Sequence, residues 1–420
     1  MVLPFLTGGE NNLFVIIQTL MSLAFVGLIF FFPKIMIWQT DRKLRGVLES
    51  LETYKDSSEQ LFVDSISGEM SEKQRNKFES LKDFKMSAPT NLDPAGMVGK
   101  LEHVLDTSEN KFNRFIEGTA ETEDEEELAD LNMAFKGVMG THQIHKVMRH
   151  FRQLIKKTGN IQLVGMINMM VPIYEEIAEA QHQATRAFVD NAPIGDSIGP
   201  LVAAKMIESE PEEVSEDIIR SEEEIGDQKV HVIKSTGPGA RLGKYGDAVD
   251  DIAEENDLEA IITVDAGAKF EGEETGSISE GVGVMMGGPG VEKTKIEEAA
   301  TEHDVPLEGI VIKQSPPEAS KPMKKPIYEA YKPAVKKVEE IVKEFDGEVA
   351  VIGVGNTCGV GDSREQVSGT HNKLRKYWNE YEEQEDDEVS YMGLMGLMGG
   401  GDQSELMEMK DRYLMDLPRS

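Results

Sequence analysis

The chain has 420 residues, and its 77 acidic against 44 basic side chains give a formal net charge of −33. A chain of this length has room for roughly two or three domains. The excess of negative charge argues against a nucleic-acid partner, because phosphate binding needs a basic surface. Cys358 is the only cysteine, so an intrachain disulfide and a cysteine metal cluster are both excluded.

An uncharged apolar stretch, Leu13 to Phe32, lies near the start of the chain. It is about as long as a helix needs to be to cross a bilayer core, and it lacks the basic n-region and cleavage site of a signal peptide. Glu10 is the only charge before it, whereas four basic residues follow it: Lys34, Arg42, Lys43 and Arg45. We therefore expect residues 1–38 to hold a single-pass transmembrane helix in the cell membrane, with the C-terminal domain in the cytoplasm.

Residues 39–191 carry the apolar spacing of helices, as in MVGKLEHVLDTSENKFNRFI, and lack the alternating runs of strands. This pattern predicts an all-α helical stalk or bundle. We expect the chain to form a homo-oligomer through this region.

Residues 192–363 alternate short apolar runs with helical stretches. Such a rhythm predicts an α/β domain of three layers with a mostly parallel sheet. We expect the run Val349 to Val354 to lie inside this sheet, beside Ala260 to Val264 or Val230 to Lys234. Residues 364–420 are acidic and rich in Met and Gly, a composition typical of disorder.

In a parallel α/β sheet, ligands bind beyond the carboxyl ends of the strands. Asp265 follows the apolar strand IITV at such an end, and glycine-rich loops follow other strands. Glycines allow close approach of the backbone to a ligand, and basic side chains add positive charge. The alternative is that these loops are tight turns. The candidate ligand-binding residues are Gly237, Gly239, Arg241, Lys244, Gly287 and Gly288.

The stretch IITVDAGAKFEGEETGS, Ile261 to Ser277, resembles the hydrogenase maturation endopeptidases, in which a strand ends in Asp-Ala before an acidic glycine-rich loop. The spore germination protease has a similar Asp-Ala segment. PIGDSIGPLVAAKMI resembles the acidic turn and first helix of the maturation enzymes, and VAVIGVGNT resembles their first strand. The order differs, because here the Gly-Asn strand follows the acidic turn, as in a circular permutation. The whole chain also resembles an uncharacterised family of archaeal single-span membrane proteins.

This resemblance implies that Asp196 and Asp265 are the acidic residues of a catalytic or metal site and that Asn356 shapes it. The histidine of the maturation enzymes has no counterpart. Two facing aspartates can hydrolyse a bond by sharing one proton, or they can bind a divalent metal that polarises a carbonyl. The alternative is structural: Asp196 caps the following helix, and Asp265 accepts bonds from loop N–H groups.

We therefore expect a membrane-anchored hydrolase of endopeptidase type that faces the cytoplasm and acts on a protein or peptide. The alternative function is a non-enzymatic, oligomeric assembly protein at the membrane, whose α/β domain binds a small ligand or ion.

Overall fold

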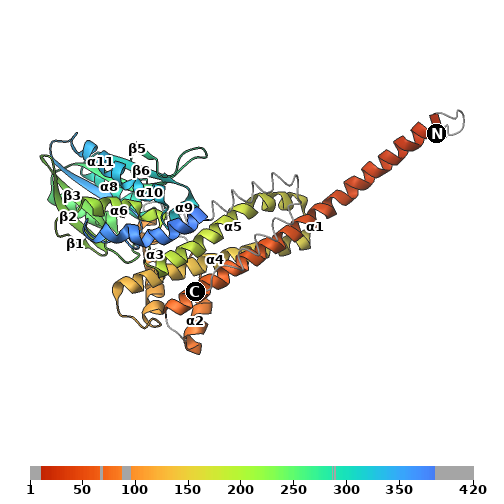
Figure 1. Cartoon of the computed structure of the whole chain (residues 1–420), viewed down its shortest axis with the longest axis horizontal. Coiled ribbons are helices and arrows are strands. Elements are labelled where there is room, and N and C mark those ends of the chain that lie inside the picture. The colour runs from red at the N-terminus through yellow and green to blue at the C-terminus, as the bar shows by residue number, and fades with distance from the viewer. Residues whose placement is uncertain (1–10, 67–69, 88–95, 286, 288–289, 384–420) are drawn as a thin grey trace. The chain divides into compact units, whose positions relative to one another are not determined.

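The computed structural model describes residues 11–66, 70–87, 96–285, 287 and 290–383 (Figure 1). These residues fall into two compact units. Unit 1 lies within residues 1–53 and 144–176, and unit 2 lies within residues 54–143 and 177–420.

The described part of the N-terminal half is helical, which confirms the prediction of an all-α region for its described residues. The helices follow one another through short connections. Their bounds are α1 Asn11–Ile66, α2 Glu72–Lys82, α3 Met97–Glu117, α4 Glu125–Thr158 and α5 Ile161–Val189.

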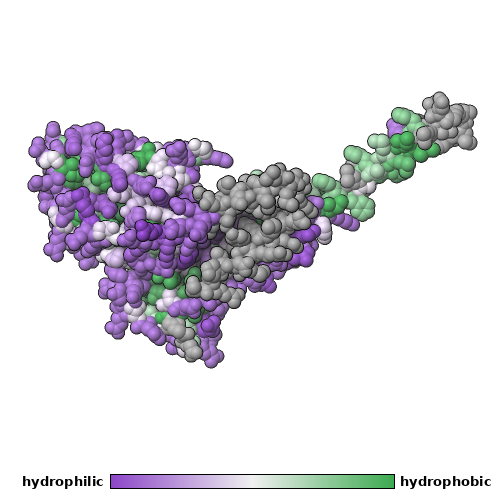
Figure 2. All heavy atoms as spheres, in the orientation of Figure 1, coloured by the Kyte–Doolittle hydropathy of each residue, from purple (hydrophilic) through white to green (hydrophobic). Residues whose placement is uncertain are grey.

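The first part of α1 carries exposed apolar side chains, visible as a green stretch in Figure 2, among them Phe14, Met21 and Phe25. Within the described residues, however, no single helix combines the length and hydropathy that a membrane crossing needs. The segments Phe14–Gly27 and Phe31–Ile66 meet these criteria only as a pair, with a 45° bend between them. Pro33 lies inside α1, and proline kinks the helical turn before it. The described residues therefore do not show the single membrane-spanning helix that was expected over Leu13 to Phe32.

In unit 1, the side chains of α1 and α4 form a charged cluster around Asp41. Its carboxylate accepts from Arg152 Nε at 2.7 Å and pairs with Lys156 at 3.3 Å. Asn168 of α5 donates to Thr40 Oγ1 at 2.9 Å. Polar contacts at these positions specify the register in which the three segments pack.

Unit 2 holds an aromatic core in its helical part, where stacked and tilted rings meet. Its members include Phe62, Phe78, Phe112, Phe115 and Phe135. The same core contains residues from loops of the sheet domain and from the segment after β7, namely Ala240, Cys358 and Tyr377. The helices of residues 54–143 and the sheet domain therefore share one hydrophobic core.

The sheet has seven strands among the described residues, in the order β1-β2-β3-β7-β4-β6-β5. The central strands β3, β7, β4 and β6 run parallel, and β1, β2 and β5 pair antiparallel at the two edges. The strand bounds are β1 Glu212–Ser215, β2 Ile218–Ile225, β3 Gln228–Ser235, β4 Leu258–Ala268, β5 Ile278–Val282, β6 Leu307–Gln314 and β7 Glu348–Gly353.

The prediction of a mostly parallel sheet is wrong, because half of the neighbouring pairs are antiparallel and the sheet is mixed. The additional strands lie at the edges and carry charged side chains, so they lack the apolar runs that identified the central ones. The placement of β7 is confirmed, since it lies between β3 and β4, with Val351 opposite both Val232 and Ile262.

Helices cover both faces of this sheet. One buried cluster joins it to α6 Ile198–Met206, α10 Lys325–Glu329 and α11 Tyr331–Val342. The other joins it to α7 Tyr245–Glu255 and α8 Val291–Glu302. The short α9 Pro316–Ser320 follows β6. In α7 the buried residues recur at the spacing of one helical face, which explains why this segment packs on the sheet.

Residues 370–383 are also helical, with Leu374 and Trp378 buried in the cluster that contains α11. Trp378 Nε1 donates to Met323 O at 2.8 Å. This part of the predicted disordered tail is therefore folded. The rest of that tail, residues 384–420, lies outside the described residues.

The start of α6 packs directly on the backbone at the ends of β4 and β7. A Cβ on Gly199 would lie 2.1 Å from Val354 O and 2.5 Å from Val264 O. Only glycine permits this approach, because both contacts are to backbone atoms that cannot rotate away.

Substitution at this contact gives a direct test of the fold. We expect Gly199→Ala to lower the free energy of unfolding by about 1 to 3 kcal/mol, the usual cost of overpacking. The matched control is Gly99→Ala in α3, where an added Cβ meets nothing within 4 Å and stability should be unchanged or raised by up to about 1 kcal/mol. Chemical denaturation of both variants checks this. Equal stabilities of the two variants would contradict the packing described here.

Candidate functional site

Polar residues gather where the parallel strands of the sheet end. Asp265 lies near the end of β4, Gln314 ends β6, and Asn356 follows β7. The 3-10 turn η2, Gly195–Ser197, approaches the same edge because it precedes α6, whose start packs on the ends of β4 and β7. The topology thus brings segments far apart in sequence to one place.

Asp196 is held by the loop after β7. Its Oδ2 accepts from the backbone N of Asn356 at 2.9 Å. Gly355 has φ +137°, and a Cβ there would lie 2.1 Å from Asp196 O, so this position requires glycine. The N-cap of α6 is Ser197, and no side chain caps the helix. Asp196 therefore does not have the capping role that was the alternative interpretation.

Asp265 is 3 % exposed. Its Oδ1 accepts from the N–H of Ala266 at 2.6 Å, as the structural interpretation of this residue required. Its Oδ2 is buried and has no hydrogen-bond partner among the described residues. The contact with Ala266 satisfies Oδ1 as a hydrogen-bond acceptor, but no contact among the described residues satisfies Oδ2.

The two carboxylates act on each other electrostatically. Burial, and then the neighbouring charge of Asp196, raise the pKa of Asp265 well above its usual value, while the Ala266 N–H lowers it. Burial also raises the pKa of Asp196, and the bond from Asn356 opposes this shift. Two like charges close together do not both ionise easily, so the charge of Asp196 favours the protonated form of Asp265.

Tyr245 was not identified from the sequence. Its hydroxyl donates to Gly353 O at 3.0 Å and contacts Ser235 Oγ at 2.7 Å. Burial raises its pKa, and the charges of Asp265 and Asp196 raise it further. Tyr245 therefore lies within electrostatic reach of both aspartates and ties β3 to β7 beside them.

Several other polar side-chain atoms at this edge are buried and have no hydrogen-bond partner among the described residues. Buried polar atoms are paired in most proteins, so such a group at one edge indicates a binding or reaction site. The atoms are Ser197 Oγ, Thr236 Oγ1, Asp265 Oδ2, Gln314 Nε2, Gln314 Oε1 and Asn356 Nδ2. Of these residues, only Asp265 and Asn356 were candidates from the sequence.

The basic residues predicted to bind a ligand are engaged by carboxylates. Arg241 pairs with Glu126 at 2.8 Å and with Asp217 at 3.1 Å. Lys244 pairs with Glu216 at 2.9 Å and with Asp106 at 3.4 Å. Their charges stabilise the fold and are not directed at the aspartate pair.

Two of the predicted glycines, Gly237 and Gly239, bind acidic side chains of the chain through their N–H groups. Gly237 donates its N–H to Asp362 Oδ1 at 2.8 Å, and Gly239 donates to Glu126. Gly287 is exposed, and Gly288 lies outside the described residues. The loop after β3 therefore binds the start of α4 and does not form a cradle for a ligand.

The predicted metal site rests on two carboxylates, Asp196 and Asp265. Among the described residues, no group of three or more His, Cys, Asp or Glu side chains is placed to hold a metal ion. Asp196 and Asp265 alone are too few for zinc, which takes at least three protein ligands. Mg²⁺ differs from zinc here, because it can bind through one or two carboxylates with water completing its coordination.

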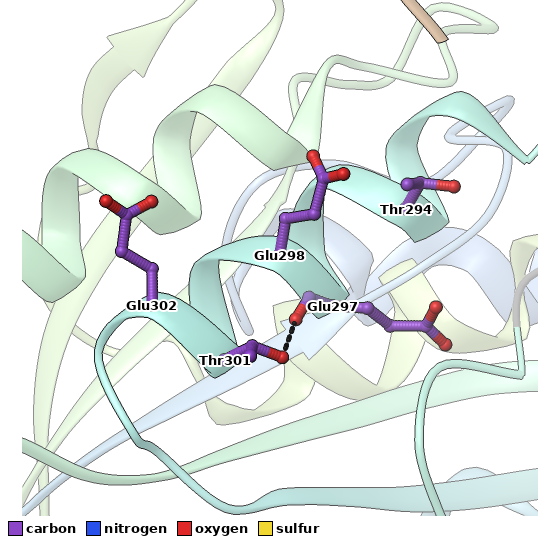
Figure 3. Close-up of a pocket in the computed structure, with 5 residues that line it drawn as sticks. All are labelled: Thr294, Glu297, Glu298, Thr301 and Glu302. Atoms are coloured by element: carbon purple, nitrogen blue, oxygen red, sulfur yellow. Dashed lines mark hydrogen bonds between the residues drawn. The ribbon is translucent and has the colours of Figure 1, made fainter. Parts of the chain in front are cut away.

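A hollow on the surface of α8 shares no residue with the aspartate pair. Thr294, Glu297, Glu298, Thr301 and Glu302 line it. Figure 3 shows Thr301 bonded within the helix, where its hydroxyl donates to Glu297 O at 2.7 Å. This acidic helix surface carries no functional assignment.

Comparisons with known proteins add a family match. Residues 18–191 match a model described as "Protein of unknown function (DUF1512) N-terminal domain", and residues 194–361 match "Domain of unknown function (DUF1512) C-terminal". Neither the curated proteins nor the solved structures contain a match to this chain.

The protonation of Asp265 makes stability depend on pH. A carboxyl whose folded-state pKa is raised stabilises the fold fully below its unfolded pKa and loses this contribution as pH rises through the folded pKa. Asn mimics the protonated form, so Asp265→Asn should melt at the same or a higher temperature than the wild type at pH 8. The difference should shrink toward pH 4.

Thermal unfolding across this pH range checks the prediction, with Asp251→Asn, at an exposed position of α7, as the matched control. A lower melting temperature of Asp265→Asn at pH 8 would show instead that the ionised carboxylate is a structural acceptor.

Proposed function

The chain belongs to the DUF1512 family, and we propose that its C-terminal domain is a hydrolase of endopeptidase type in which Asp196 and Asp265 are the catalytic pair. The observation that carries the proposal is the electrostatic effect of the half-buried Asp196 on the buried Asp265, whose Oδ2 has no partner among the described residues. The resemblance of the segments around both aspartates to the maturation endopeptidases and the germination protease supports it.

The environments of the two aspartates assign their roles. Asp196 is half-buried and receives an N–H bond, which favours its ionised form. Asp265 is more deeply buried, and burial and the charge of Asp196 raise its pKa, which suits it to hold the proton. A pair whose pKa values are pushed apart in this way supplies a base and an acid at the same pH.

In the proton-sharing form of the proposal, the two aspartates catalyse hydrolysis together. Asp196 takes a proton from a water molecule while the oxygen of that water bonds to the peptide carbonyl carbon. At the same time, Asp265 gives its proton to the carbonyl oxygen. The C–N bond of the tetrahedral intermediate breaks as Asp196 returns its proton to the leaving amine. The remaining hydroxyl returns a proton to Asp265, which restores the pair and leaves a carboxylic acid and an amine.

A second candidate function is binding of a small ligand or ion without chemistry, as in an assembly protein. The unpaired buried atoms of Ser197, Thr236 and Asn356 favour it, since they could be satisfied by a bound polar molecule. Cell-membrane localisation and self-association stay predictions, and neither candidate depends on them.

Peptide cleavage by the purified chain tests the proposal, with labelled β-casein as an unstructured substrate. We expect Asp196→Asn and Asp265→Asn each to lower kcat by about 100-fold to 10,000-fold, the usual contribution of a general acid or base. Asp251→Asn is the matched control and should cleave like the wild type. The rate should follow a bell-shaped pH profile, because one carboxyl must be ionised and the other protonated.

A chelator separates the two chemical forms of the proposal. The proton-sharing form predicts the same rate with and without EDTA. Loss of activity in EDTA, with recovery on adding Mg²⁺ or Mn²⁺, would favour the divalent-metal form. Absence of cleavage by the wild type would leave ligand binding as the better candidate.

A further inference from the structure

Residues 144–174 of unit 1 form a basic stretch in an acidic protein. They cover the end of α4 and the first half of α5, and they include no Asp or Glu, although 77 of the 420 residues of the chain are acidic. The stretch has a positive local charge, opposite in sign to the net charge of −33. Its basic side chains are Lys146, Arg149, Arg152, Lys156 and Lys157.

The neighbouring part of α1 neutralises the end of α4 only in part. Asp41 is the first acidic residue of α1, and its carboxylate pairs with Arg152 at 2.7 Å and with Lys156 at 3.3 Å. One negative charge therefore faces two positive charges. Arg149 and Lys157, on the same stretch of α4, are exposed to solvent. The end of α4 thus keeps a positive charge that an anionic partner can meet.

Exposed apolar side chains lie beside this charge. The turn after α4 packs against α1, because a Cβ on Gly159 would lie 3.7 Å from Ile37 Cδ1. The next residue of α1, Trp38, is 59 % exposed. On α5, which begins just after the turn, Met166 and Met169 are 48 % and 78 % exposed. Basic and apolar groups therefore occur together at the end of α4.

The apolar part of this surface continues along α1. The first part of that helix exposes large apolar side chains, among them Phe14, Met21 and Phe25 (Figure 2). Exposed apolar surface of this extent is typical of a contact with a membrane or with another protein. Tryptophan is enriched where a bilayer meets water, and clustered Lys and Arg attract anionic headgroups. An apolar segment and a basic cluster are together the two features that hold a protein stably on a bilayer.

We propose that the end of α4, through Arg149 and Lys157, and the adjacent Trp38 bind the surface of a bilayer that contains anionic lipids. The proposal goes beyond the hydrolase function and does not depend on it, and it needs no helix that crosses the bilayer. Nucleic acid would meet the same positive charge but would leave the exposed Met169 in water. Two copies of this chain each carry a charge of −33 and repel each other.

Sedimentation of the full chain with lipid vesicles tests the proposal. Its affinity is measured for vesicles of phosphatidylcholine and for vesicles of equal parts phosphatidylcholine and phosphatidylglycerol. The ratio of the two affinities reports the electrostatic part of binding, because the apolar part of α1 contributes to both. We expect the wild type to prefer the anionic vesicles. The double variant Arg149→Gln/Lys157→Gln should lower the ratio about tenfold to 30-fold, since each basic side chain near an anionic surface contributes about fivefold.

The matched control is Arg75→Gln/Lys77→Gln, the same two changes at exposed positions of α2, which should leave the ratio unchanged. Trp38→Ala should weaken binding to both kinds of vesicle by a similar factor, because its ring contributes through apolar contact. All the changed side chains are exposed, so the melting temperatures of the variants should stay close to that of the wild type.

Equal affinity of the wild type for the two kinds of vesicle would overturn the proposal, as would an equal fall of the ratio in both double variants. If Arg149→Gln/Lys157→Gln keeps the ratio but lowers the mass of the chain in analytical ultracentrifugation, the surface joins two copies and the proposal is wrong. The proposal is also wrong if this variant keeps the ratio and loses binding to single-stranded RNA.

Discussion

The close approach of the turn before α6 to the ends of β4 and β7 determines where the polar groups of the site lie. Gly199 rests on the backbone of Val264 and Val354, and Gly355 lies against the backbone of Asp196. These contacts involve main-chain atoms that cannot rotate away, so they fix the position of the turn relative to β4 and β7. Because β4 and β7 are paired in register, the same contacts bring Asp265 and Asn356 to the turn. The site therefore follows from how the backbone packs.

The central part of the sheet could be predicted from sequence because β3, β4, β6 and β7 are buried on both faces. Their apolar, β-branched runs stand out against the acidic surroundings. The edge strands could not be found in the same way. β2, which lies beside the edge strand β1, reads IIRSEEEI, and the edge strand β5 reads ISEGV. Both expose charged side chains to water and lack a long apolar run. β2 and β3 pair antiparallel because they form a hairpin, and β5 pairs antiparallel with β6. The pattern of apolar residues does not predict either arrangement.

The residues of the site that could be predicted are those whose place at the end of a strand or before a helix puts them at the carboxyl edge of the sheet. Asp265 and Asn356 follow apolar strands, and Asp196 precedes a helix, so all three could be assigned to one edge. Gln314 and Tyr245 could not, since the pairing of a polar atom depends on neighbours far away in sequence. The prediction that Arg241 binds a ligand failed for the same reason, because its partner is distant in sequence. A basic residue in a glycine-rich loop suggests a ligand, but its carboxylate partner Glu126 comes from a helix more than a hundred residues earlier.

The contact between α4 and the loop after β3 affects where the folding unit that contains the aspartate pair begins. Asp130 of α4 accepts from Ala240 N at 2.9 Å and from Asn191 Nδ2 at 2.7 Å. The loop in turn holds the residue after Asn356, since Thr357 N donates to Arg241 O at 3.0 Å. The two family models meet between residues 191 and 194, within this chain of contacts. A fragment that begins at that border would lack the acceptors Glu126 and Asp130, which bind the loop beside Asn356. We therefore expect a cooperatively folding piece with the aspartate pair to need the start of α4.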